Sequence, residues 1–212
     1  MNNVKLRRMT TAALCGAVGF VLMFISFSIP VISPFAEFDL SALPDLIGGF
    51  ILGPAGAVMI VTVKIVLKLL FKGTTSMFTG ELQSFILSLA YVLPAVLYYR
   101  SHKTRKGAAV SLVIGSLVSI VVSIFTNVYL IFPAFMTLYG MDWDSIVAMC
   151  TAVAPWIKDV PSMVAFSIVP FNIISRVVTS LITMVVYKNI SVPIKNLIYE
   201  DNRRTYHELQ CK

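Results

Sequence analysis

Three charged residues occur where the sequence is otherwise strongly apolar. Lys64 and Lys68 lie one helical turn apart in the apolar stretch 55–71, and Glu81 directly precedes the next stretch, 82–99. A charge at mid-bilayer costs about 2.5–3.5 kcal/mol on insertion scales, so such groups usually face the interior of a helix bundle. We therefore expect Lys64 to face the interior. For Lys68 two arrangements are open: pairing with Glu81, or extension to the outer membrane interface.

Two amides and a further cation add to this set. Asn127, Asn172 and Arg176 lie within two later apolar stretches, 108–132 and 163–187. An amide in apolar surroundings needs hydrogen-bond partners, and between two helices it can act simply as glue. Two asparagines, a glutamate and a lysine at similar outer depth on different helices favour a site for a polar ligand instead.

Small residues form a stripe on the first apolar stretch, 9–29. Ala12, Ala13, Gly16 and Ala17 repeat at the spacing of one helical turn. Small residues four positions apart allow a second helix to approach closely. That second helix either belongs to the same bundle or to a partner protein, and the sequence leaves both possibilities open.

Other chemical motifs do not occur in the sequence. Cys15, Cys150 and Cys211 have no metal-binding spacing, and His102 and His207 lie in polar segments. There is no G-x-x-x-x-G-K-[ST] loop for ATP and no G-x-S-x-G nucleophile motif. We therefore expect no metal, no cofactor and no enzymatic activity, and any ATP hydrolysis must come from another protein.

The composition indicates a membrane protein. Apolar residues make up 58% of the chain and charged residues only 13%, and the mean hydropathy is +0.86. Soluble domains are roughly half apolar and about a quarter charged, so too few charges are present to coat a soluble core. The net charge of +7 comes from clusters between apolar runs. Such clusters fit the positive-inside rule rather than nucleic-acid binding.

The apolar stretches predict an all-α bundle of six transmembrane helices. They run over residues 9–29, 40–52, 55–71, 82–99, 108–132 and 163–187. Because a span needs about 20 residues, the second and third could instead form one helix through Gly53 and Pro54, which would give five spans. Six spans place most Lys and Arg inside, with both termini, as the positive-inside rule requires. Gly53 and Pro54 then form a tight inside turn.

This topology puts two long loops, 30–44 and 134–161, on the outside. The acidic residues assigned to outside segments are Glu37, Asp39, Asp45, Asp142, Asp144 and Asp159. Since the second helix is too short to cross alone, we expect neighbouring helices to shield it and the first loop to fold over it. The whole chain, 1–212, is expected to form one membrane domain, with a polar cytoplasmic tail from about residue 188.

Several segments together resemble a known family. They are FDLSALPDLIGGFILGP, VTVKIVLKLLFKGTT, TGELQSF, NVYLIFP and PFNIISRVV. In this order they resemble the substrate-binding S component of energy-coupling factor (ECF) vitamin importers, most closely the riboflavin-specific branch. The resemblance extends from the first helix to about residue 187.

Membership of this family would imply a six-helix bundle that holds its ligand near the outer face, under the first loop. It would also imply an energising module of one membrane-embedded coupling subunit and two ATPases. By resemblance, Ala13 and Ala17 match the docking face for the coupling subunit, and Asn127 and Asn172 match flavin contacts. Ser175 stands where the riboflavin branch has a lysine. The candidate substrate-binding residues are Asn127, Asn172, Glu81, Lys64, Asp39 and Ser175.

The sequence thus predicts a high-affinity substrate-binding subunit of an ECF-type importer in the cell membrane, with riboflavin as the transported ligand. The isoalloxazine ring is flat and mostly apolar and suits an aromatic, Met-lined cavity, whereas the ribityl hydroxyls need polar partners. Three alternatives stay open. The ligand could be another vitamin or a flavin derivative, the chain could be a small membrane enzyme that uses Glu81 and Lys64 as an acid/base pair, or it could be a scaffold without a ligand.

Overall fold

A computed structural model describes residues 3–29, 33–74, 76–152 and 154–187. The polar tail expected from residue 188 lies outside this range. The helices are α1 Asn3–Phe24, α2 Ala42–Leu52, α3 Pro54–Phe71, α4 Thr79–Ser101, α5 Arg105–Thr126, α6 Phe132–Tyr139, α7 Trp143–Thr151 and α8 Val160–Met163, with π-helical turns η1 Asn127–Ile131 and η2 Val164–Ile168. The last helix continues from η2, so that the whole run spans Val160–Tyr187.

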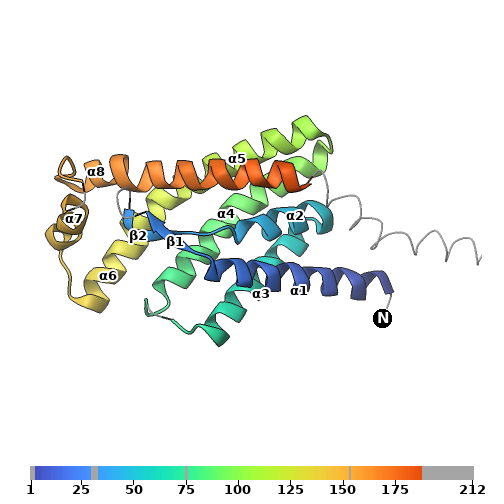
Figure 1. The fold of residues 1–212 in the computed structure, drawn as a ribbon, viewed down its shortest axis with the longest axis horizontal. Helices are drawn as coiled ribbons and strands as arrows, with labels where there is room; N and C mark the ends of the chain where they lie inside the picture. Colours follow the sequence, from blue (N-terminus) through green and yellow to red (C-terminus); the bar gives the residue numbers. More distant parts are fainter. Residues whose placement is uncertain (1–2, 30–32, 75, 153, 188–212) are drawn as a thin grey trace, which may run out of the picture.

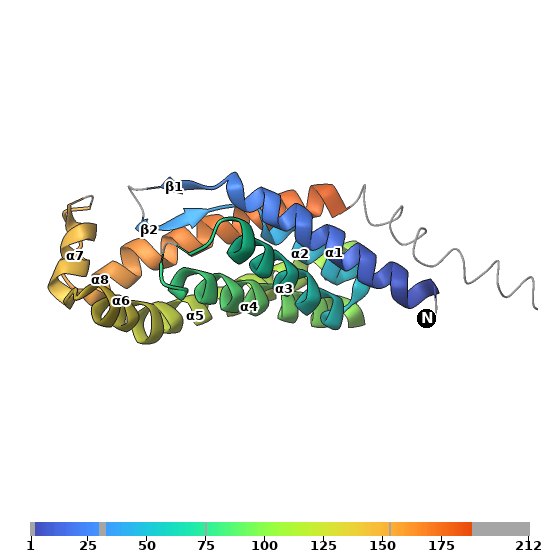
Figure 2. The same cartoon turned by 90° about the horizontal axis from the view of Figure 1, so that it is seen from below.

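Most of the chain forms long helices that run through the length of the molecule (Figures 1 and 2). Five helical runs are long and apolar enough to cross a membrane: Lys5–Phe24, Pro54–Phe71, Thr79–Ser101, Arg105–Tyr139 and Val160–Tyr187. The expectation of a helical protein with several candidate spans is therefore confirmed. In Figure 1, α7 lies at the end of the molecule opposite the N-terminus.

The short helix α2 lies inside the bundle. All of its 11 residues are buried, and it packs against α1, α3 and α4. An ideal Cβ placed on Gly48 would lie 2.3 Å from Ile60 Cδ1 of α3, so the missing side chain is what lets the two helices approach. The expectation that neighbouring helices shield this segment is confirmed.

Gly53 separates α2 from α3. Its φ of 84° is a left-handed conformation that favours glycine, and Pro54 begins α3 at a position where its missing N–H costs nothing. Because α2 and α3 then pack against each other, the alternative of one fused helix across Gly53 is wrong.

A short β-hairpin departs from the all-α expectation. Strands β1 Phe27–Ile29 and β2 Ser33–Phe38 pair antiparallel, with Phe27 opposite Phe38. At the base of the hairpin, Ser26 Oγ donates to Glu37 Oε2 at 2.8 Å. A hairpin satisfies backbone groups that a loop near the membrane would leave unpaired, and it leads directly into α2.

The second long loop is more helical than expected. Helix α5 does not end at residue 132 but continues through η1 and α6 to Tyr139, and α7 follows. These elements bury a separate apolar cluster whose members include Phe132, Ile146, Cys150 and Met163. The expected loop 134–161 is therefore largely folded, because its apolar residues pack together at one end of the bundle.

Candidate functional site

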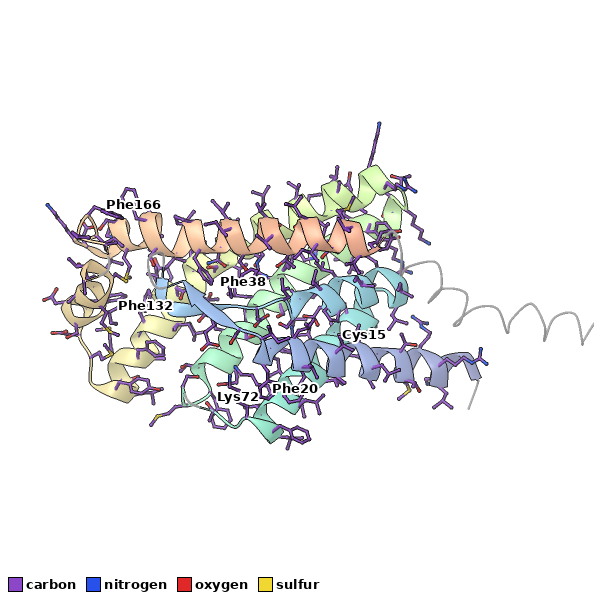
Figure 3. All side chains as sticks on the ribbon, in the orientation of Figure 1. Cys15, Phe20, Phe38, Lys72, Phe132 and Phe166 are labelled. Atoms are coloured by element: carbon purple, nitrogen blue, oxygen red, sulfur yellow. The ribbon has the colours of Figure 1, made fainter. Side chains whose placement is uncertain are left out.

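A cavity of about 340 Å³ opens among the helices beside the hairpin. Its walls come from α1, the segment that joins β2 to α2, α3, α4, η1, α6, α7 and the final helix. Two of its lining residues, Phe132 and Lys72, are labelled in Figure 3 and lie in the half of the molecule away from the N-terminus. Most of the bundle thus contributes to this one cavity.

The structure brings most of the sequence-predicted site residues to this cavity. Those that line it are Asp39, Glu81, Asn127, Asn172 and Ser175. Lys64 does not line it, because its side chain is fully buried behind Ser41 and Ser88, which do. Five polar groups from four separate segments of the chain therefore face one space.

The two asparagines use their amide groups in the same way. Asn127 Nδ2 donates to the carbonyl oxygen of Ser123 at 2.7 Å, and Asn172 Nδ2 donates to that of Ile168 at 2.9 Å. Each amide is thus anchored to its own helix, and within the described part of the chain neither bonds another helix. This geometry does not fit the interpretation that the amides join two helices by hydrogen bonds. Each Oδ1 remains available to accept a hydrogen bond from a molecule in the cavity.

Both asparagines adjoin a π-helical turn. Asn127 begins η1, and Asn172 follows η2 by one turn. Such turns insert an extra residue into a helix and are frequent at functional sites. The insertion changes which side chains of the helix face the cavity, and the amphipathic pattern of the sequence did not reveal it.

Lys68 and Glu81 form an ion pair at the cavity. Lys68 Nζ lies 3.2 Å from Glu81 Oε1, and the side chains are 20% and 5% exposed. Glu81 Oε2 also accepts hydrogen bonds from Thr74 Oγ1 at 3.0 Å and Ser76 Oγ at 3.1 Å. Of the two arrangements left open for Lys68, pairing with Glu81 is confirmed.

Lys64 has a partner that the sequence did not predict. Its Nζ pairs with Asp45 Oδ2 and lies 3.3 Å from both Ser41 Oγ and Ser88 Oγ. Asp45 is fully buried in the first turn of α2, so it is part of the bundle interior and not of an exposed loop. Because Lys64 pairs with Asp45, and Glu81 with Lys68, an acid/base pair of Glu81 and Lys64 is not formed.

Arg176 also lines the cavity and was not among the predicted site residues. Its guanidinium carbon lies 4.7 Å from the centroid of the Tyr91 ring. Its Nε is buried and has no hydrogen-bond partner among the residues that the structure describes. The signal was present in the sequence as a charge within an apolar stretch, but only the fold shows that the charge reaches the cavity.

The remaining wall is apolar and rich in aromatic and sulfur-containing side chains. Phe132, Phe135, Phe171, Met23 and Met163 belong to it. Cys150 of α7 lines the same wall, and burial raises the pKa of its thiol, which keeps it neutral. A flat apolar ligand with a polar chain would find a matching surface for each part.

The small-residue stripe of α1 divides between two faces. Ala12 is buried, and an ideal Cβ on Gly16 would lie 2.7 Å from Val63 Cγ1, so these two residues pack inside the bundle. Ala13 is exposed and Ala17 is half-buried. The sequence left open whether the stripe faces inward or outward, and the structure places parts of it on both sides.

In the described residues, no group of three or more His, Cys, Asp or Glu side chains could hold a metal ion. The polar groups of the cavity are amides, hydroxyls, carboxylates and cations. Such a set suits hydrogen bonding to an organic ligand.

Comparison with known proteins gives consistent results. Residues 7–187 match the family described as "ECF transporter, substrate-specific component". The riboflavin transporter RibU of Staphylococcus aureus (strain TCH60) is 26% identical over 197 residues, which cover 93% of this chain and 97% of that protein. The riboflavin transporter FmnP of Bacillus subtilis (strain 168) is 25% identical over 185 residues, covering 87% and 92%.

A solved structure is similar to the whole bundle. It is described as "Structure and mechanism of the S component of a bacterial ECF transporter". The TM-score is 0.70 at 27% sequence identity, and the match covers 90% of this chain and 99% of that one.

Proposed function

This chain belongs to the family of ECF transporter substrate-specific components, and we propose that it binds riboflavin for an importer of this type. Membership makes it a multi-pass membrane transport component rather than an enzyme, and it needs no cofactor, since riboflavin is the cargo. The observation that carries the proposal is the cavity, which joins an aromatic and Met-lined wall to a polar wall.

The chemistry of riboflavin fits these two walls. Its isoalloxazine ring is flat and largely apolar, which suits contact with Phe132, Phe135 and Phe171. Its carbonyls and hydroxyls need hydrogen bonds, which Asn127 and Asn172 can provide. The cavity volume of about 340 Å³ lies within the range of small-ligand pockets. A scaffold without a ligand would have no use for such a cavity.

The test is direct. The protein purified in detergent from cells grown with riboflavin should be yellow and show flavin absorbance, and riboflavin fluorescence should be quenched on titration. Competition with flavin derivatives and with unrelated vitamins separates the riboflavin proposal from its nearest alternatives. Colourless protein that does not quench riboflavin fluorescence would contradict the proposal.

We further propose that Asn127, Asn172, Glu81, Asp39 and Ser175 contact the ligand, while Lys64 supports Ser41 and Ser88 from behind. Asn127→Ala and Asn172→Ala should each weaken riboflavin binding about 5- to 150-fold, because a lost hydrogen bond that leaves a buried partner costs about 1–3 kcal/mol. The measurement is the dissociation constant by fluorescence titration.

Thr126→Val is the matched control for Asn127. Thr126 Oγ1 also bonds carbonyls of its own helix, those of Val122 and Ser123, but it is not among the cavity-lining residues. The riboflavin affinity of the Thr126→Val variant should stay within about twofold of that of the unmodified protein. Unchanged affinity in both asparagine variants would remove these two residues from the site.

We propose that the whole chain forms one domain in the cell membrane, with six crossings and both termini inside. The charge distribution supports it, because basic residues cluster at the N-terminus, around Lys103 and in the tail. Single cysteines in a variant free of native cysteines should be labelled at position 103 only from inside and at position 142 only from outside. Labelling of position 103 from outside would contradict this topology.

We propose that α1 docks onto a coupling subunit that carries two ATPases, through Ala13 and Ala17. The exposure of Ala13 supports a contact with a partner. Ala13→Leu should leave riboflavin binding intact and abolish uptake in cells, because a close helix contact does not tolerate the added volume.

Ala12→Leu is the matched control, since Ala12 is buried in the bundle. Overpacking there should cost about 1–3 kcal/mol of stability, so binding and uptake should fall together. If Ala13→Leu behaved like Ala12→Leu, the docking proposal would be wrong.

A further inference from the structure

Arg176 differs from the other cations inside the bundle. Lys64 and Lys68 each have a carboxylate partner. Across the residues that the structure describes, Arg176 has no ion pair and no hydrogen bond, although its Nε is buried and its side chain lines the cavity. A guanidinium carries five N–H donors and no acceptor, and donors that stay buried without partners are costly.

Two carboxylates interact electrostatically with Arg176, and one oxygen of each is bonded to another group. Asp39 and Asp45 both act electrostatically on Arg176. Asp45 Oδ2 is bound by Lys64, and Asp39 Oδ1 accepts from the backbone N–H of Ser41 at 2.8 Å. Asp45 Oδ1 is buried and, among the described residues, has no hydrogen-bond partner. Neither carboxylate forms an ion pair with Arg176 among the described residues, so its N–H donors are available to a ligand with acceptor oxygens in the cavity that Arg176 lines.

Tyr91 fixes the position of this guanidinium. The Tyr91 side chain is fully buried, and its ring lies beneath the Arg176 guanidinium at 4.7 Å. Its hydroxyl shares a 2.7 Å hydrogen bond with Ser180 Oγ, one turn beyond Arg176 on the same helix. Gly115 of α5 allows close packing against Tyr91, since an ideal Cβ there would lie 2.4 Å from the Tyr91 carbonyl oxygen and 3.2 Å from Tyr91 Cδ2.

We propose that Tyr91 is a positioning residue that holds Arg176 against the cavity, so that Arg176 donates hydrogen bonds to acceptor oxygens of the bound ligand. This inference rests on the proposed function for its ligand, riboflavin. A desolvated cation over an aromatic ring is attracted to it, and the ring restricts a side chain that would otherwise sample many rotamers. Tyr91 does not itself line the cavity, so its effect on binding must pass through Arg176.

A double-mutant cycle tests this route. Arg176→Met, which removes the donors but keeps most of the length, should weaken riboflavin binding about 5- to 150-fold. Tyr91→Leu should weaken it about tenfold, whereas Tyr91→Phe, which keeps the ring, should stay within about threefold. When Arg176 is already replaced by Met, adding Tyr91→Leu should lower the riboflavin affinity by less than about twofold. The residue that Tyr91 positions is then no longer present.

The matched control cycle combines Tyr91→Leu with Asn127→Ala. In the Asn127→Ala protein, Tyr91→Leu should still lower the riboflavin affinity about tenfold. Thermal unfolding of every variant establishes that it is folded. Should Tyr91→Leu give no folded protein, Tyr91→Met takes its place, since it retains more of the volume and still lacks a ring.

Two results would overturn the inference in a protein that binds riboflavin. One is an equal loss from Tyr91→Leu with and without Arg176, and the other is an equal loss from Tyr91→Phe and Tyr91→Leu. Absence of riboflavin binding by the unmodified protein is a separate result, and it would overturn the proposed function together with this inference.

Discussion

The two lysines of α3 lie one turn apart and end in different surroundings. The inner pair, Lys64 with Asp45, is completely buried and is joined by Ser41 and Ser88. The outer pair, Lys68 with Glu81, lies at the cavity, and its lysine is 20% exposed. Two identical side chains on one helix therefore differ in their partners and in their exposure to water.

The difference between the pairs follows from desolvation. Removing one partner of a buried ion pair leaves an uncompensated charge, which is far more costly than the net contribution of the intact pair. Removing one partner of a partly exposed ion pair costs less stability, because water and neighbouring hydroxyls can replace the missing partner. We therefore expect that removing one partner costs more stability at the inner pair than at the outer pair.

Lys64→Met should have the largest effect on stability. It leaves Asp45 buried without its cation, at a cost of about 3–5 kcal/mol. The free energy of unfolding, measured in detergent with a denaturant, should fall by this amount, with Lys68→Met as the matched control. A loss of less than about 1 kcal/mol would mean that Asp45 is not an isolated charge in the variant.

Adding Asp45→Leu to Lys64→Met should restore most of this loss. Replacement of a whole buried pair by apolar residues is often neutral or stabilising by about 1–4 kcal/mol. The stability of the double variant should therefore return to within about 1 kcal/mol of the unmodified protein. Additive losses of stability would contradict the pairing, since the effects of substitutions add at independent sites but not at residues in contact.

Lys68→Met should cost only about 1–2 kcal/mol of stability, between the values for exposed and buried pairs. Glu81 keeps Thr74 and Ser76 as donors after the lysine is removed. The measurement is the same denaturant unfolding. A loss as large as that of Lys64→Met would erase the distinction between the two pairs.

The smallest expected effect is the dependence of these stability differences on salt concentration. Raising the ionic strength to about 1 M shortens the Debye length to about 3 Å and screens charges near water more than buried ones. The stability difference between the unmodified protein and Lys68→Met should narrow in high salt, whereas that for Lys64→Met should stay nearly constant. Equal narrowing of both differences would indicate that water reaches the inner pair.

The sequence alone determined the features that depend on composition and local spacing. A membrane protein with several spans follows from 58% apolar residues, and the turn at Gly53 follows from a glycine and a proline between two apolar runs. The interior position of Lys64 was also predictable, because depth along a span can be counted in residues. The same count offered Glu81 as a partner for Lys68 but left extension to the membrane interface equally open.

Only the tertiary structure decided which groups meet across the bundle. Asp45 and Lys64 are separated by 19 positions, and Tyr91 and Ser180 by 89. No periodicity within one helix specifies such contacts, because they depend on how helices rotate and cross. The hairpin, the helices within the second loop, the π-helical turns beside the asparagines and the two faces of the α1 stripe were decided in the same way. Each depends on neighbours that local sequence does not encode, since backbone and apolar groups take whichever partners the completed bundle offers.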